Sequence, residues 1–359
     1  MNLRSEEPRP QAPRPPRRRA RLVVILVAAL VAVVAVGAMA LTRPGSEARP
    51  RSATGGPSGP TTASPEPSAQ PSASEPSPST DPSTGPSGSQ TPQQPEPTKR
   101  KPSWTSCLTV PSLTPMTVLT FNIHAGVSPD GAQLGAIAEE IRRTGADVVL
   151  LQEVDRFRSR SRYVDTPAWL AAELGMYQAF AANLVLPSTA RGGGRQEYGL
   201  ATLSQWPIVD SERVALPRPP GTEQRGLLRT RLDLGDYELD VYNTHLEHSS
   251  GAARRQQVRT ILDVLADREE PAVIGGDFNA TEGGPVHSML AASLTDAWLR
   301  VGEGEGHTVP ARAPRSRIDQ VFVAGPLIPL AARVVTSAIS DHRAVGVDLM
   351  VAHLADPTC

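Results

Sequence analysis

The sequence predicts a mixed α/β domain in which β-sheets pack against each other and helices lie on the outside. From Met116 onward, short apolar segments typical of strands alternate with amphipathic helices. Several strands follow one another through short turns, and only some are separated by helices, which indicates sheets packed together with helices outside. About 256 residues remain after a long proline-rich tract, enough for one good-sized folded domain.

Residues 1–21 form a basic tail that precedes an apolar segment. Leu22 to Leu41 is twenty residues without a charge, the length of one α-helical bilayer crossing. The arginines at 17–19 favour a cytoplasmic N-terminus, so we expect a single-pass protein of the cell membrane with the rest outside. A cleaved signal peptide is the alternative, because residues 38–40 (Ala-Met-Ala) resemble a cleavage site, and the protein would then be secreted.

Residues 42–103 are predicted to be a disordered linker. They hold fifteen of the 36 prolines and no aromatic residue, so the segment cannot bury enough apolar surface to offset its ordering entropy. The remaining 104–359 is the predicted catalytic domain. It contains Cys107 and Cys359 near its two ends, and an exported pair of this kind is a disulfide candidate, with two unrelated thiols as the alternative.

The first part of the domain predicts strand, helix, strand, helix. Val118 to Ile123 is an apolar strand, and Asp130 can cap a helix through Ile141 that Gly145 ends. Asp147 to Gln152 is a second strand. Thr166-Pro167 then opens a helix that ends at Gly175, because proline is favoured in the first helical turn.

Strands dominate the rest of the domain. Four are joined by short turns, at residues 198–203, 208–216, 227–232 and 237–244. Ser250 can cap a helix through Leu265 with an apolar stripe on one face. A short strand at 271–274, a helix led by Pro285, and strands at 318–323, 330–335 and 344–351 complete the domain.

Gly275-Gly276-Asp277-Phe278-Asn279 is the most informative stretch. The two glycines would let the backbone turn tightly and leave room for a close approach. Asp277 and Asn279 are two apart, so in extended chain they would point the same way and could hold a water or a phosphoryl oxygen. The structural alternative is a strand followed by an Asx-turn.

Polar residues recur at the ends of the predicted strands, where catalytic groups gather on loops held by a rigid sheet. They are Asn122, Glu153, His245, Asp277, Asn279, Asp319, Asp341 and His342. Thr120-Phe121-Asn122-Ile123-His124, Leu151-Gln152-Glu153, Gly276-Asp277-Phe278-Asn279 and Ser340-Asp341-His342 resemble, in this order, the motifs of the endonuclease/exonuclease/phosphatase superfamily. The resemblance runs from about Met116 to Val351 and implies a four-layer α/β/β/α sandwich and metal-dependent cleavage of phosphate esters.

The resemblance also implies roles for these residues. Glu153 would be the main carboxylate ligand of Mg²⁺, with Asn122 beside it and Asp341 assisting, and Mn²⁺ is an alternative ion. Magnesium takes hard oxygen ligands and needs few protein groups. His342 would be the general base or the electrostatic partner at the phosphorus, oriented by Asp319.

The remaining positions would serve the attacking water and the phosphate. Asp277 would orient or deprotonate the water, while Asn279 and His245 would hold non-bridging oxygens. Glu197 could pair with His245, as in pancreatic deoxyribonuclease. Arg225 is expected to be a solvated charge at a strand edge, with contact to the substrate as the alternative.

Together these patterns predict an exported, membrane-tethered, monomeric Mg²⁺-dependent phosphoesterase. Residues 1–103 hold 13 basic and 7 acidic residues, which leaves 23 and 30 in the domain and a net charge of −7 there. An acidic domain is a poor polyanion binder, so a phospholipid headgroup or small phosphodiester is favoured over nucleic acid. The alternatives are an extracellular nuclease acting on DNA or RNA and a non-catalytic tethered binding module on the same fold.

Overall fold

The structure, a computed structural model, describes residues 111–128, 131–187, 194–268 and 271–354. The basic tail, the apolar segment at 22–41, the linker and both cysteines lie outside these residues, so the predictions for them remain predictions. Within the described ranges, no helix combines the length and the apolar character that a bilayer crossing requires.

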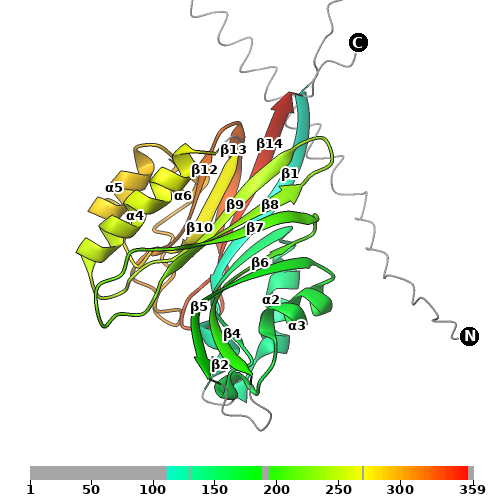
Figure 1. Ribbon diagram of the computed structural model, residues 1–359. Coiled ribbons are helices and arrows are strands. Elements are labelled where there is room, and N and C mark those ends of the chain that lie inside the picture. The colour runs from blue at the N-terminus through cyan, green and yellow to red at the C-terminus, as the bar shows by residue number, and fades with distance from the viewer. Residues whose placement is uncertain (1–110, 129–130, 188–193, 269–270, 355–359) are drawn as a thin grey trace, which may run out of the picture. The chain divides into compact units, whose positions relative to one another are not determined.

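Two six-stranded sheets lie face to face (Figure 1). The strands of the first sheet, in spatial order, are β13 (Leu327–Val334), β14 (Val345–Leu354), β1 (Pro111–Asn122), β4 (Val148–Arg156), β6 (Arg195–Ser204) and β5 (Tyr177–Pro187). Those of the second are β11 (Thr295–Asp296), β12 (Asp319–Ala324), β10 (Ala272–Asp277), β9 (Glu238–His245), β8 (Gly226–Asp233) and β7 (Ile208–Ala215). Each sheet is mixed, because β1 runs parallel to β4 and β9 runs parallel to β10, while the other pairs are antiparallel. A small hairpin, β2 (Val127–Ser128) and β3 (Gly131–Ala132), lies apart from both.

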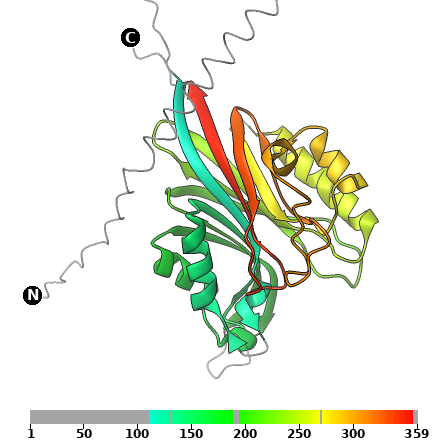
Figure 2. The ribbon, with the colours of Figure 1, turned by 180° about the vertical axis from the view of Figure 1, so that it is seen from behind.

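Helices cover the outer faces of the two sheets (Figures 1 and 2). On the first sheet lie α2 (Leu134–Thr144) and α3 (Thr166–Leu174), and on the second α4 (Gly251–Ala266) and α5 (Pro285–Ala291). The short α6 (Ala297–Val301) packs against β12 and β13 instead, with Trp298 in the core between the sheets. Two 3-10 turns, η1 (His124–Gly126) and η2 (Ser159–Ser161), follow β1 and β4. The apolar side chains accordingly form one core between the sheets and one under each pair of outer helices.

Most predicted elements are present, and the helix-end signals explain their boundaries. Gly145 and Gly175 end α2 and α3 in the left-handed conformation, and the Ser250 side chain accepts a hydrogen bond from the N–H of Ala253 at 3.2 Å. The residue that caps α3 is Asp165, one position before the predicted Thr166. The sequence prediction missed β5, an edge strand in which Asn183 separates two short apolar segments.

The predicted tight turn at Gly275-Gly276 is wrong, because both residues continue β10 between β9 and β12. A Cβ on Gly275 would lie 2.7 Å from Leu150 Cδ1 of the opposite sheet. A Cβ on Gly276, whose φ is +156°, would lie 2.0 Å from the backbone oxygen of Thr244. The space that two side chains would take is therefore occupied by Leu150 of the opposite sheet and by the backbone of β9. The absence of these side chains lets β10 pack closely against both.

Gly276→Ala is therefore expected to lower the free energy of unfolding by about 3 kcal/mol, the upper range for overpacking, because the clash is with backbone and cannot relax by a rotamer change. Urea unfolding followed by circular dichroism measures the change. Gly135→Ala on α2 is the matched control, since its Cβ would meet nothing within 4 Å and alanine reduces the entropy of the unfolded chain. Equal stability of Gly276→Ala and the unsubstituted protein would contradict this account of the strand.

Candidate active site

The polar residues at the strand ends converge on one edge of the two sheets. Asp277 at the end of β10 is paired with His245 at the end of β9 and with Asp319 at the start of β12. In the other sheet, Asn122 ends β1 beside Gln152 of β4. The side-chain amide of Asn122 donates to Asp277 Oδ2 at 3.1 Å, so a direct hydrogen bond joins the two sheets at this edge.

Glu153 reaches the same edge through an irregularity in β4. The pairing of β4 with β6 shifts between Leu151 and Val154, and Glu153 has a φ of 57°. A left-handed residue breaks the alternation of the strand, and the Glu153 carboxylate accepts from Asn122 Nδ2 at 3.1 Å. The preceding Gln152 is buried and donates to Asn243 Oδ1 of β9 at 2.8 Å, a second hydrogen bond between the sheets.

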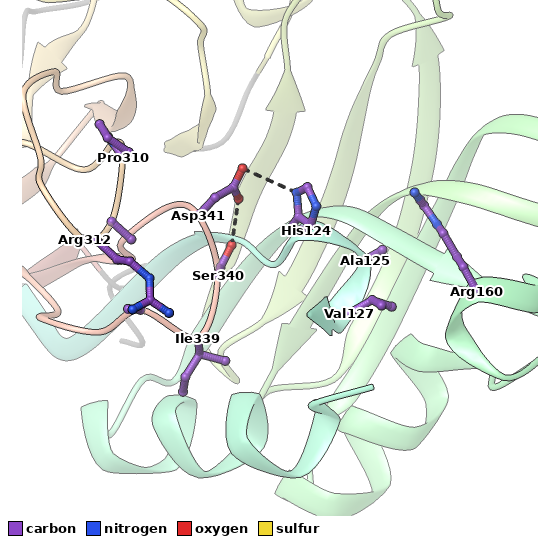
Figure 3. Close-up of a pocket in the computed structure, with 11 residues that line it drawn as sticks. His124, Ala125, Val127, Arg160, Pro310, Arg312, Ile339, Ser340 and Asp341 are labelled. Atoms are coloured by element: carbon purple, nitrogen blue, oxygen red, sulfur yellow. Dashed lines mark hydrogen bonds and ion pairs between the residues drawn. The ribbon is translucent and has the colours of Figure 1, made fainter. Parts of the chain in front are cut away.

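His124, for which the sequence suggested no role, lies between Glu153 and Asp341. Its Nδ1 is 3.4 Å from Asp341 Oδ2 and 3.9 Å from Glu153 Oε2 (Figure 3 shows the first contact). The backbone N–H of His124 donates to Asn122 Oδ1 at 3.1 Å, and its φ is 46°. The two predicted metal-binding carboxylates therefore both lie near the same nitrogen of His124, on the open side of the site.

His342 and Asp319 form the buried side. The two oxygens of Asp319 lie 3.1 and 2.9 Å from His342 Nδ1, so this nitrogen carries a proton and donates it to the carboxylate. The other ring nitrogen, Nε2, then faces Asp277 Oδ2 at 3.8 Å. Ser340 holds this loop against β1, because its hydroxyl donates to the backbone oxygen of Asn122 at 2.7 Å and accepts from the His342 N–H at 3.3 Å.

Burial and neighbouring charges separate the proton affinities of these groups. Burial alone would lower the pKa of His342, but the carboxylates of Asp319, Asp277 and Asp341 outweigh it and raise that pKa to about 10. Burial, followed by the charge of Asp319, raises the pKa of Asp277 above its ordinary value. At neutral pH the site therefore holds an imidazolium beside a carboxylate that is more basic than a solvated aspartate.

Arg225 is a site residue whose predicted environment is wrong. The expected solvated charge is 4% exposed, and its Nη1 lies 3.0 Å from His245 Nδ1 and 3.0 Å from Glu223 Oε1. Burial, together with the positive charges of Arg225 and His342, lowers the pKa of His245 well below its usual range, so the ring is neutral. Since a guanidinium can only donate, His245 accepts on Nδ1 and directs Nε2–H toward Asp277 Oδ2, 3.4 Å away.

Two further expectations for this region need correction. Glu197 pairs with Arg156, Oε2 to Nη1 at 3.3 Å, and His245 has Arg225 as its partner instead. Asn279 has a φ of 47°, so it does not continue the strand beside Asp277. Its N–H donates to Asp277 Oδ1 at 2.9 Å, an Asx-turn, and its side-chain Nδ2 donates to the Leu246 oxygen at 3.0 Å. Asn279 thus fixes the Asp277 carboxylate and the loop after β9.

Two sets of side chains could hold a cation. Asp277, Asp319 and His342 are buried, and their ligand atoms lie within 4.8 Å of one another. The predicted set is Asn122, which is buried, and Glu153 and Asp341, which are partly exposed; amide and carboxylate oxygens are the hard ligands that Mg²⁺ prefers. In the buried set, His342 and Asp319 already pair with one another, whereas Asp341 of the predicted set is half exposed.

A comparison with known protein families covers both the fold and the site residues. The model of the endonuclease/exonuclease/phosphatase family matches residues 119–342, the span from the end of β1 to His342. The chain belongs to this family. An endonuclease/exonuclease/phosphatase structure from Beutenbergia cavernae is 27% identical, with a TM-score of 0.56 over 67% of this chain and 72% of that chain.

Other proteins share the fold or part of the sequence. A mannosyl-6-phosphatase from Bacteroides thetaiotaomicron is 17% identical, with a TM-score of 0.55 over 65% of this chain and 99% of that one. Protein cwh43 of Schizosaccharomyces pombe is 28% identical over 155 residues, which is 43% of this chain but only 15% of the length of cwh43. Membership in this family supports a hydrolase acting on phosphoester bonds as the enzyme class.

Proposed function

We propose that the chain hydrolyses phosphate esters with a bound Mg²⁺, or Mn²⁺, by in-line attack of water on phosphorus. The observation that carries the proposal is the continuous chain of contacts from Glu153 through Asn122, Asp277 and His342 to Asp319. It joins both sheets at one edge and places a carboxylate with raised pKa beside an imidazolium.

Glu153, Asn122 and Asp341 would hold the ion. When bound, the ion supplies positive charge beside the phosphoryl oxygens, where negative charge builds up during the attack. The carboxylates of Glu153 and Asp341 fit this use, and Asn122 fixes Glu153 through its Nδ2 while its Oδ1 accepts from the His124 N–H.

The protein groups divide the proton chemistry between them. Asp277, held by Asn122 and by the Asn279 N–H, is placed to accept a proton from the attacking water. His342 stays protonated through its bond to Asp319 and presents Nε2–H to the charge developing on a phosphoryl oxygen. The neutral His245 offers a second N–H from the neighbouring strand.

The substrate is proposed to be a phospholipid headgroup or another small phosphoester, and the working location is outside the cell. The net charge of −7 on residues 104–359 favours a small ester over a polyanion. The uncharged segment from Leu22 to Leu41, behind arginines, supports export and a membrane tether.

A substrate panel assayed with metal and with chelator tests the proposal. Plasmid DNA, RNA, phospholipids, sphingomyelin, inositol phosphates and a chromogenic diester would be compared. Chelation is expected to lower the rate at least about a hundredfold, roughly 3 kcal/mol of transition-state stabilisation, and added Mg²⁺ or Mn²⁺ should restore it. Chelator already saturated with Mg²⁺ is the control. A rate that chelator does not change would contradict the metal requirement, and ligand binding without turnover would indicate a binding module. Preferred cleavage of DNA or RNA would move the assignment to a nuclease.

A further inference from the structure

A pocket of about 590 Å³ opens next to the site on the side of His124 and Asp341 (Figure 3). It is bounded by the turn η1, by Arg160 of η2, by the turn at residues 310–312 and by the loop at 338–341. Its walls are mainly apolar side chains, those of Ala125, Val127, Pro310, Ala311, Ala338 and Ile339. A phosphate group alone does not need such a volume, which is in the range of pockets that enclose a small organic molecule.

The pocket is continuous with the candidate active site. Asp341 lines it and directly precedes His342, and His124 lines it while lying 3.9 Å from Glu153. An ester with its phosphorus beside Asp277 and His342 would therefore extend one of its alcohol groups past His124 and Asp341 into this space.

Two arginines stand on different walls of the pocket, with His124 and Asp341 between them (Figure 3). Arg160 is fixed, because its Nε and Nη2 donate to the two oxygens of the buried Asp155 at 2.7 and 2.8 Å. Arg312 is exposed, and within the described part of the chain its guanidinium has no ion-pair or hydrogen-bond partner. The guanidinium of Arg312 therefore stands beside apolar side chains without an ion-pair partner among the described residues.

We propose that this pocket binds an alcohol group of the substrate and that this group carries a second anion, a phosphate or a carboxylate, which Arg312 holds. The proposal rests on the proposed phosphoesterase function and narrows its substrate class. An arginine fork matches both kinds of anion in two parallel hydrogen bonds.

Binding to an inactive variant tests the pocket without any turnover. We would titrate His342→Ala, carrying Mg²⁺, with phenyl phosphate and with 4-carboxyphenyl phosphate, which differ by one carboxylate. The charged ligand is expected to bind about tenfold more tightly, and adding Arg312→Gln should abolish this preference. Arg315→Gln is the matched control, because Arg315 is an exposed arginine of the same loop that does not line the pocket.

Kinetics on the active protein give an independent reading. For 4-nitrophenyl diesters whose second alcohol is phenol or 4-hydroxybenzoate, Arg312→Gln should lower kcat/KM about tenfold for the carboxylate ester and leave the phenyl ester within about twofold. Equal loss with both esters, or no loss with either, would overturn the pocket assignment. Absence of hydrolysis by the unsubstituted protein would instead count against the proposed function, and the titration would still decide the pocket.

Discussion

His342→Ala is expected to lower kcat/KM for phosphate ester hydrolysis about a thousandfold, in the middle of the range for removal of an acid–base group. The imidazole is held on one side by Asp319, at 2.9 Å, and faces Asp277 with its free nitrogen at 3.8 Å. Its removal takes away the N–H donor nearest the phosphorus. The substitution also leaves the buried carboxylates of Asp277 and Asp319 without the imidazolium between them. The charge of Asp319 then raises the pKa of Asp277 further, so Asp277 is protonated more of the time and is a poorer base toward water.

Asp319→Asn should produce a smaller loss that appears mainly in kcat, because the ring remains but is no longer held as the Nδ1–H tautomer with a raised pKa. Steady-state kinetics with a chromogenic diester at saturating Mg²⁺ measures both variants, with circular dichroism to confirm that they are folded. His307→Ala is the control, since this ring pairs with the exposed Glu305 and lines a different pocket. Unchanged rates in His342→Ala would remove His342 from the reaction and leave the contact with Asp319 as a structural one.

The residue types of the site could be predicted from the sequence because catalytic polar residues at strand ends interrupt apolar segments. Asn122, Asp277 and Asp319 stand where an apolar strand ends or begins, and the sheet register then brings Asp277 opposite Asp319. What the sequence could not supply is contact across the sandwich. The hydrogen bond from Asn122 to Asp277 joins residues 155 positions apart in different sheets, and no local pattern encodes that distance.

Local backbone conformation explains the other differences. The alternation rule assumes extended chain, and both Glu153 and Asn279 have positive φ values, so their side chains leave the direction that spacing predicts. The predicted solvation of Arg225 is wrong because it takes charge as a sign of exposure. The available signal was its position directly before Gly226-Leu227-Leu228, a segment that is buried throughout. An arginine that leads into such a strand must find partners inside, and His245 and Glu223 are those partners.

Glu153→Gln is expected to weaken Mg²⁺ binding about a hundredfold and to lower activity by a similar factor at limiting metal. The substitution keeps the size of the side chain but removes the negative charge beside Asn122. Mn²⁺ binding followed by electron paramagnetic resonance measures the metal affinity directly. Hydrolysis rates measured across a metal titration show how far the activity depends on that affinity. Glu139→Gln is the control, because Glu139 is a surface residue of α2 that pairs with Arg142.

The same titration decides between the two sets of possible ligands. If the ion lies on the open side, Glu153→Gln weakens Mn²⁺ binding while Asp319→Asn, whose carboxylate is taken up by His342, changes it little. If the ion lies in the buried group of Asp277, Asp319 and His342, the order reverses, and His342 could not remain a free N–H donor. An ion held by the open-side ligands leaves His342 and Asp277 available for proton transfer. If Glu153→Gln lowers only the metal affinity, activity should return at high Mg²⁺. That result would support a division of roles between metal ligands and acid–base groups.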